Sequence, residues 1–222
     1  MSVTALSAAP ATARIEARLL AHRYGTRIAL ESLDFVIEPG VTAVTGANGS
    51  GKSTLLRIIA GLLRPTGGEC RVSVGERALQ PGARRGVLGL ATPELSFYDE
   101  LSALENLAFA AEARGLKTPV AAASVALERV ELMSRAHDRA GALSSGMKQR
   151  LRLAFAALGD PPILLLDEPG SHLDEAGRAT LDRWIAEESR RSLVLLATNE
   201  EREWRLAGRR IQLCGRNLGH TA

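Results

Sequence analysis

The chain has 222 residues, of which 45% are hydrophobic and 24% are charged, and its formal net charge is +3. This composition is ordinary for a soluble globular protein and suits one domain, or one domain with an inserted lobe. The positive residues are scattered, so the charge does not indicate nucleic-acid binding. No apolar run approaches the roughly 20 residues that cross a bilayer, so we expect no membrane channel. Cys70 and Cys214 lack the spacing of metal ligands.

Alternating apolar residues predict two antiparallel strands near the start of the chain. Ile15, Ala17 and Leu19 alternate with charged residues, and a second alternation covers residues 33–37. Tyr24 lies at the end of the first strand. Two interpretations of Tyr24 stay open: its ring stacks on an adenine, or it packs a turn.

A glycine-rich segment at residues 46–54 fits the pattern G-x-x-x-x-G-K-[ST]. An apolar run at residues 41–44 precedes it, and apolar residues at helical spacing follow it, so a strand enters this loop and a helix leaves it. Glycines let successive backbone N–H groups converge on a phosphate, and the helix N-terminus adds positive potential. Lys52 is placed to reach the β- and γ-phosphates, and the Ser53 hydroxyl is placed to hold Mg²⁺. The predicted nucleotide-binding residues here are Gly46, Asn48, Gly49, Ser50, Gly51, Lys52, Ser53 and Thr54.

The middle of the chain changes to a helical pattern. Ser102 and Glu105 form a capping box ahead of an apolar stripe, and Thr118-Pro119 has the cap and first-turn proline of a second helix. We therefore expect a helical subdomain to be inserted into an α/β core. The predicted plan is a flexible tail at 1–13 without the features of a secretory signal, a core at about 14–93 and 144–222, and a helical subdomain at about 94–143.

Two carboxylates end an apolar segment in the second half of the chain. Residues 163–166 read as a fully buried parallel strand, and Asp167 and Glu168 follow it directly. Strand ends of this kind are where α/β sheets bind ligands. A helix at about 175–188 and another buried strand at 193–197 come next. The fold class predicted is α/β, with a mainly parallel sheet and antiparallel N-terminal strands.

The order of these segments resembles ABC-type ATPase subunits over about residues 15–213. Ser144, Ser145 and Gly146 stand where the family has its signature motif, and Asp174 ends a turn similar to the family's turn after the carboxylates. The resemblance implies a P-loop NTPase with a RecA-like core. It also implies that two such domains dimerise head to tail and enclose two Mg-ATP, each held by one P-loop and the partner's signature motif. Those four residues would then contact nucleotide, Asp167 with Ser53 would hold Mg²⁺, and Glu168 would act as general base.

Two positions depart from the family pattern. Aligning backwards from Leu101 puts Pro93 in the slot of a glutamine that contacts Mg²⁺ and water, and Glu94 follows it as a substitute. Asn199 stands where the family has a switch histidine. Asparagine can hydrogen-bond a γ-phosphate but carries no proton charge at neutral pH. We therefore expect Asn199 to take part in ATP hydrolysis, the hydrolysis to be slow, and the nucleotide to bind normally.

The resemblance implies the ATP-binding and ATP-hydrolysing subunit of a membrane transporter. Stretches at 100–107 and 144–150 are similar to export-type subunits, including the haem-exporter ATP-binding subunit of cytochrome c maturation. Phe97 and Tyr98 either anchor an integral membrane subunit or fold back onto the helical lobe. The expected location is cytoplasmic, on the inner face of the membrane, with no nucleic-acid partner. The alternatives are a soluble ABC ATPase of the iron–sulfur assembly type and a hydrolysis-impaired module gated by nucleotide.

Overall fold

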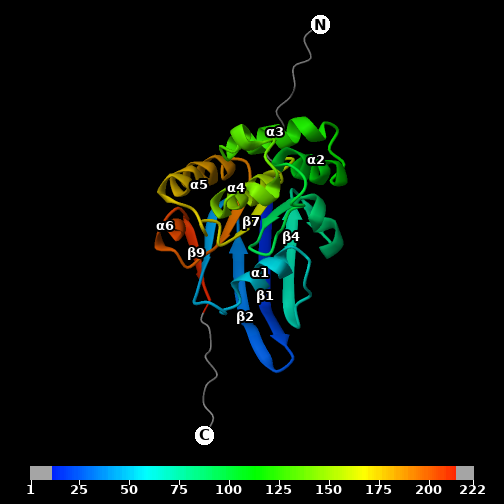
Figure 1. Cartoon of the computed structure of the whole chain (residues 1–222). Helices are drawn as coiled ribbons and strands as arrows, with labels where there is room; N and C mark the ends of the chain where they lie inside the picture. Colours follow the sequence, from blue (N-terminus) through cyan, green and yellow to red (C-terminus); the bar gives the residue numbers. More distant parts are fainter. Residues whose placement is uncertain (1–11, 214–222) are drawn as a thin grey trace.

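The computed structural model describes residues 12–213, which form two β-sheets with helices packed around them (Figure 1). One sheet is antiparallel, with the strand order β2-β1-β4-β5. Its strands are β1 (Ala13–Tyr24), β2 (Arg27–Ile37), β4 (Gly67–Val74) and β5 (Arg77–Leu79). The tail predicted at residues 1–13 falls almost wholly outside the described residues.

The second sheet is entirely parallel, with the order β6-β7-β8-β3-β9. Its strands are β3 (Gly40–Thr45), β6 (Leu88–Ala91), β7 (Ile163–Asp167), β8 (Leu193–Ala197) and β9 (Arg209–Gln212). Every residue of β7 and β8 is buried, because both faces of this sheet are covered. That burial explains why the two strands read as unbroken apolar runs. The predicted α/β fold class, with antiparallel N-terminal strands, is confirmed.

Six α-helices are present among the described residues. They are α1 (Lys52–Ile59), α2 (Ala103–Ala113), α3 (Pro119–Arg129), α4 (Ser145–Ala157), α5 (Glu175–Glu188) and α6 (Glu201–Trp204). Three 3₁₀ turns are also present in the described part of the chain: η1 (Pro81–Gly86) between β5 and β6, and η2 (Met133–Arg135) and η3 (Ala140–Ala142) between α3 and α4. Both α2 and α3 fall in the segment predicted as a helical subdomain, and they lie together at the top of Figure 1. No helix between residues 12 and 213 is long and apolar enough to cross a membrane.

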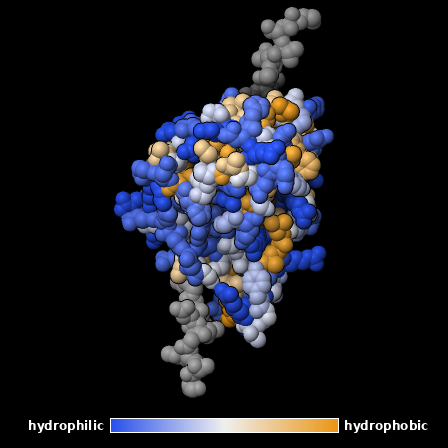
Figure 2. Space-filling view, in the orientation of Figure 1, coloured by the Kyte–Doolittle hydropathy of each residue, from blue (hydrophilic) through white to orange (hydrophobic). Residues whose placement is uncertain are grey.

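The parallel sheet separates two hydrophobic clusters. Leu164 and Leu166 of β7 pack with residues of α2 to α5, whereas Ile163 and Leu165 pack with α1 and the antiparallel sheet. Successive residues of a strand point to opposite faces, so one five-residue strand serves both clusters. Most of the surface in Figure 2 is hydrophilic, and hydrophobic side chains appear in small separate groups.

One local prediction was wrong, and a second was confirmed in position but not in its hydrogen bond. The alternation in β1 placed Leu19 inside, but Leu19 is 64% exposed and Leu20 is fully buried. The register shifts between Ala17 and Leu20, and Leu19 has a φ of 46°, so a bulge reverses the alternation. Thr118 precedes α3 as expected but makes no side-chain capping bond, so Pro119 alone provides the favourable start.

A buried arginine fastens the end of α1 to the antiparallel sheet. Arg84 in η1 is 4% exposed and donates hydrogen bonds from Nη1 to the carbonyls of Ile58 and Ile59, both at 3.1 Å. Its Nη2 donates to the Cys70 carbonyl in β4 at 2.7 Å. The last carbonyls of a helix have no partner within the helix, and a cation there is also favoured by the helix dipole. Arg84 therefore fixes the helix that follows the glycine-rich loop.

We expect Arg84→Met to lower the free energy of unfolding by about 3 kcal/mol, because buried carbonyls lose a charged donor. Urea unfolding followed by circular dichroism measures the change. Arg85→Met is the matched control, since Arg85 is the exposed neighbour on the same turn. It should change the free energy by less than about 0.5 kcal/mol. Equal losses in the two variants would contradict this role for Arg84.

Candidate functional site

The glycine-rich loop joins the end of β3 to the start of α1. Gly46, Gly49 and Gly51 have φ values of 153°, 80° and 100°. A Cβ at Gly46 would lie 2.5 Å from Ser50 Oγ and 2.6 Å from the Leu213 carbonyl oxygen, and a Cβ at Gly51 would collide with the Ala29 carbonyl. Only glycine satisfies both the dihedral angles and the space at these positions. The conformation of the loop therefore requires glycine, as the spacing of the motif predicts.

Lys52 joins this loop to the end of β8. The side chain is 5% exposed, and Nζ donates to the Gly46 carbonyl at 2.8 Å and to Asn199 Oδ1 at 2.9 Å. Asn199 Nδ2 in turn donates to Asn48 Oδ1 at 2.5 Å. The structure therefore brings Asn199 against the loop although 147 residues separate it from Lys52. An incoming phosphate would compete with Asn199 for the same ammonium group.

The two carboxylates stand beside the loop at the end of β7. Asp167 is 4% exposed. Burial raises the pKa of its carboxyl, and a hydrogen bond from Ser53 lowers it in part. The hydroxyl of Ser53 and the carboxylate of Asp167 are the oxygen ligands that Mg²⁺ takes in proteins, so these residues fit that ion. Glu168, the next residue, has a φ of 49° and lines the adjoining cleft.

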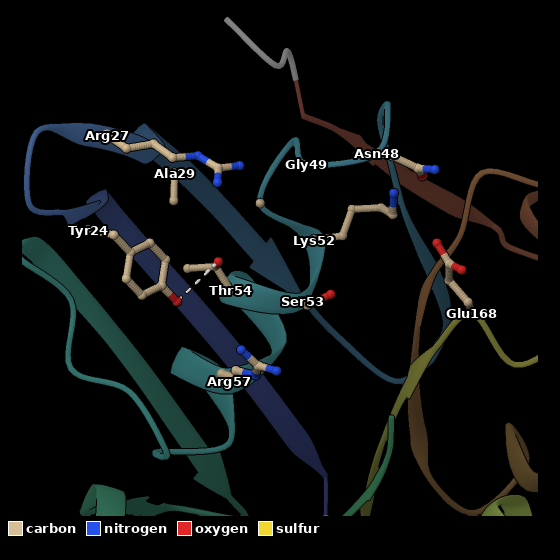
Figure 3. Close-up of a pocket in the computed structure, with 11 residues that line it drawn as sticks. Tyr24, Arg27, Ala29, Asn48, Gly49, Lys52, Ser53, Thr54, Arg57 and Glu168 are labelled. Carbon is tan, nitrogen blue, oxygen red and sulfur yellow. Dashed lines mark hydrogen bonds between the residues drawn. The ribbon is translucent and has the colours of Figure 1, made fainter. Parts of the chain in front are cut away.

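A cleft of about 380 Å³ lies between the glycine-rich loop and Glu168 (Figure 3), and neither Asp167 nor Asn199 lines it. Its size falls within the range of ordinary ligand pockets. Tyr24 lies at one side and Glu168 at the other, with Lys52 between them. Tyr24 is 45% exposed, and its hydroxyl is 3.5 Å from Thr54 Oγ1. The full lining is Tyr24, Arg27, Ala29, Asn48, Gly49, Gly51, Lys52, Ser53, Thr54, Arg57 and Glu168.

Three lining residues were missed from the sequence. Arg27 and Ala29 belong to β2, and Arg57 lies on α1. Arg57 follows Lys52 by five residues on the same helix, which was the one signal that could have indicated it. Its guanidinium donates to Glu94 Oε1 at 2.8 Å. Glu94 is therefore paired with Arg57 in this structure, and hydrogen bonds and the Arg57 charge lower the pKa of its carboxyl.

The predicted signature residues form a second, separate cleft of about 370 Å³. Ser144 caps α4 by accepting a hydrogen bond from the Met147 N–H at 3.2 Å. Asp174 caps α5 in the same way, accepting from the Gly177 N–H at 2.8 Å. Both residues are helix caps and also line this cleft, together with Ser145 and Gly146. The two clefts share no lining residue, so the structure divides the predicted nucleotide contacts into two sets.

The chain belongs to the ABC transporter family. The family profile matches residues 30–171, which include the glycine-rich loop, the signature segment and both carboxylates. The resemblance inferred from the sequence is thereby confirmed at the level of the ATP-binding domain.

Two curated relatives and one solved protein illustrate the similarity. The probable multidrug ABC transporter ATP-binding protein YbhF of Escherichia coli (strain K12) is 36% identical over 76% of this chain and 30% of its own length. The sulfate/thiosulfate import ATP-binding protein CysA of Mycobacterium tuberculosis (strain H37Rv) is 38% identical over 73% of this chain and 47% of its own. The chain thus matches less than half of each relative.

The solved protein is the ABC transporter cassette MJ0796. Its dimeric structure has a TM-score of 0.80 at 24% identity and covers 90% of this chain and 94% of its own. A second dimeric structure, of a post-hydrolysis state bound to ADP and Pi, has a TM-score of 0.77 at 23% identity, with the same coverage. At identities this low, the structural similarity shows a shared fold alone.

We expect Lys52→Met to weaken ATP binding about 10- to 100-fold, because a charge-assisted hydrogen bond to phosphate is lost from a buried position. Isothermal titration calorimetry with ATP in the presence of EDTA isolates the lysine from any metal effect. Lys117→Met, which changes an exposed lysine outside both clefts, should leave the affinity as it is. An unchanged dissociation constant in Lys52→Met would show that the glycine-rich loop does not hold the phosphates.

Proposed function

We propose that this chain is the ATP-binding and ATP-hydrolysing subunit of a membrane transporter. The observation that carries the proposal is the cleft in which the glycine-rich loop, the buried Lys52 and the carboxylate of Glu168 lie together. A phosphate cradle alone would suit many nucleotide-binding proteins. The added carboxylate at the same cleft is what hydrolysis requires.

The residues divide the chemistry among themselves. The backbone N–H groups of residues 49–53 and the Lys52 ammonium bind the phosphates. Ser53 and Asp167 hold Mg²⁺, which when bound neutralises developing charge on the phosphate oxygens. Glu168 accepts a proton from the attacking water, and Asn199 donates a hydrogen bond to the γ-phosphate. Tyr24 and Ala29 face the base and sugar from the opposite side of the cleft.

A second copy would complete each site. Ser144, Ser145, Gly146 and Asp174 lie in the separate cleft, which would face the γ-phosphate held by the partner's loop. Exposed serine hydroxyls at the N-terminus of α4 suit a phosphate group. The two structures of MJ0796, which are dimeric and of which one is bound to ADP and Pi, support the pairing of two copies. A homodimer would have this geometry, and so would a dimer formed with a close paralogue.

Glu168→Gln tests the hydrolytic function. We expect ATP turnover to fall by about 10²–10⁴-fold, because the amide accepts no proton from water, while ATP affinity changes by less than about threefold. Phosphate release by the purified chain measures turnover. Glu175→Gln, an exposed glutamate at the start of α5, is the control and should turn over ATP at the wild-type rate. Wild-type turnover in Glu168→Gln would show that another group is the base.

An apolar groove of about 290 Å³ beside α2 supports a membrane partner. The two aromatic residues at its edge behave differently. Phe97 folds back, with its ring centroid 6.3 Å from that of Phe155. Tyr98 is 59% exposed and meets the 55% exposed Phe109 edge to face at 5.8 Å. We assign this groove to an amphipathic segment of an integral membrane subunit, with Tyr98 and Phe109 as its anchors.

We also infer the direction of transport and the cellular location of the chain. YbhF is named as a probable multidrug transporter protein and CysA as an import protein, so relatives of both directions match. Export is supported by the stretches at residues 100–107 and 144–150, and the similarity to the haem-exporter subunit stays a prediction. A place on the cytoplasmic face of the membrane follows from an ATP-driven role. The soluble alternative does not account for the exposed aromatic groove, and the hydrolysis-impaired alternative does not account for Glu168 in the cleft.

Tyr98→Asp tests the membrane partner. We expect the tagged wild-type chain to co-purify with a polytopic membrane protein from detergent-solubilised membranes of its native organism, and Tyr98→Asp to lose it, because a charge enters an apolar contact. Val120→Asp on α3, where Val120 is 58% exposed outside the groove, is the matched control and should keep the partner. A soluble partner in place of a membrane protein would favour the iron–sulfur assembly alternative.

A further inference from the structure

Glu203 is a buried carboxylate that the reaction outlined above does not use. It lies on the short helix α6 and is 3% exposed. Burial raises the pKa of its carboxyl, whereas hydrogen bonds from Thr198 and from the Gly170 N–H lower it. Arg178, the cation that acts on it, is itself paired with Glu200. A buried carboxylate without a dedicated cation is costly and calls for a specific role.

The two residues that interact with the Glu203 carboxylate, Gly170 and Thr198, belong to the two loops of the candidate site, and the Oε2 atom of Glu203 is buried without a hydrogen-bond partner among the described residues. Gly170 follows Glu168 by two residues after β7, and Thr198 directly precedes Asn199 after β8. The contact with Gly170 is so close that a Cβ at this position would collide with Glu203 Oε1. Thr198 is itself fixed: it is 1% exposed, and its N–H donates to the Val44 carbonyl at 3.0 Å. Glu203 thus joins the loop of the catalytic carboxylate to the loop of Asn199.

The same peptide group is held from its other side. Gln149 on α4 is 3% exposed, and its Nε2 donates to the Pro169 carbonyl at 2.9 Å. The Pro169 carbonyl and the Gly170 N–H are the two polar groups of one peptide unit. Gln149 therefore contacts the carbonyl side of this peptide unit and Glu203 contacts its N–H side, and together they fix its orientation. This unit joins Pro169 to Gly170, one residue after Glu168.

Glu168 needs such support because its own backbone is strained. Its φ of 49° lies in the left-handed region, which is unfavourable for a residue with a Cβ. Such conformations persist only where the surrounding contacts impose them. The Glu168 N–H donates to the Ala197 carbonyl at 2.8 Å, which fixes the residue on one side. The contacts of Gln149 and Glu203 fix the residues that follow.

We propose that Glu203 is a positioning residue for ATP hydrolysis. Through its contacts with Gly170 and Thr198, it holds Glu168 and Asn199 at a fixed separation on either side of the γ-phosphate. This inference rests on the function proposed above and adds a residue that lies outside both clefts.

Glu203→Leu is the informative variant, because leucine fills a similar buried volume and accepts no hydrogen bond. We expect kcat for ATP hydrolysis to fall about tenfold or more, with the dissociation constant for ATP changed by less than about twofold, because the phosphate cradle stays intact. Hydrogen exchange followed by mass spectrometry should be faster over residues 168–174 and 197–200. Glu203→Gln should restore most of kcat, since its amide can accept from Gly170 and donate to the Thr198 oxygen.

Glu188→Leu is the matched control for the loss of a buried carboxylate. Glu188 is fully buried, burial raises the pKa of its carboxyl, and its ion-pair partners are Arg191 and Arg129. This variant should lose stability and keep kcat at temperatures where it is folded. Wild-type kcat in folded Glu203→Leu, or unchanged exchange in the two loops, would overturn the positioning role. A wild-type chain that binds but does not hydrolyse ATP would instead contradict the proposed function, and loop exchange alone would then decide whether Glu203 joins the loops.

Discussion

Ala197 at the end of β8 pairs with Val44 of β3 on one side and with Asp167 of β7 on the other. This register sets the ends of three parallel strands at one level, so the loops that follow them meet at one edge of the sheet. A shift of one residue in β7 would turn Asp167 to the opposite face. The burial of the apolar strands fixes the register, and the register in turn fixes the positions of the polar residues that follow the strands. The hydrophobic effect therefore sets the geometry of the charged site.

The site stores unfavourable interactions that a nucleotide can relieve. The buried Lys52 ammonium donates its hydrogen bonds to two neutral oxygens, those of the Gly46 carbonyl and the Asn199 amide, and burial raises the pKa of Asp167 beside Ser53. Glu168 holds a left-handed backbone conformation. Each of these costs stability in the folded chain. A phosphate would pair with the Lys52 ammonium, and a metal ion would pair with the Asp167 carboxylate. Arg84, which fastens the far end of α1, supplies rigidity behind the phosphate-binding end of the same helix.

The local part of this architecture was readable from the sequence, and the long-range part was not. Residues 46–54 and Asp167-Glu168 could be identified because strand, loop and chemistry follow one another within a few residues. Leu19 was misplaced because a bulge reverses a period-two pattern without leaving a compositional signal. Arg27, Arg57 and Glu203 were missed because their roles depend on which elements pack together. Placing Glu203 requires knowing that α6 lies against the loop after β7.

The division of the site between two clefts explains why one chain would not be enough. The phosphate cradle and the signature residues lie on different elements and share no cleft lining. In a two-fold dimer, whatever one copy supplies to its partner it also receives, so pairing would complete two equal sites at once. Asp174 caps α5 beside the signature cleft, four residues after the Gly170 that Glu203 holds. The contact between Glu203 and Gly170, which would position Glu168 for one nucleotide, therefore lies in the same segment as the turn that would face the other nucleotide. In that arrangement Glu203 would link the two sites mechanically as well as supporting one of them.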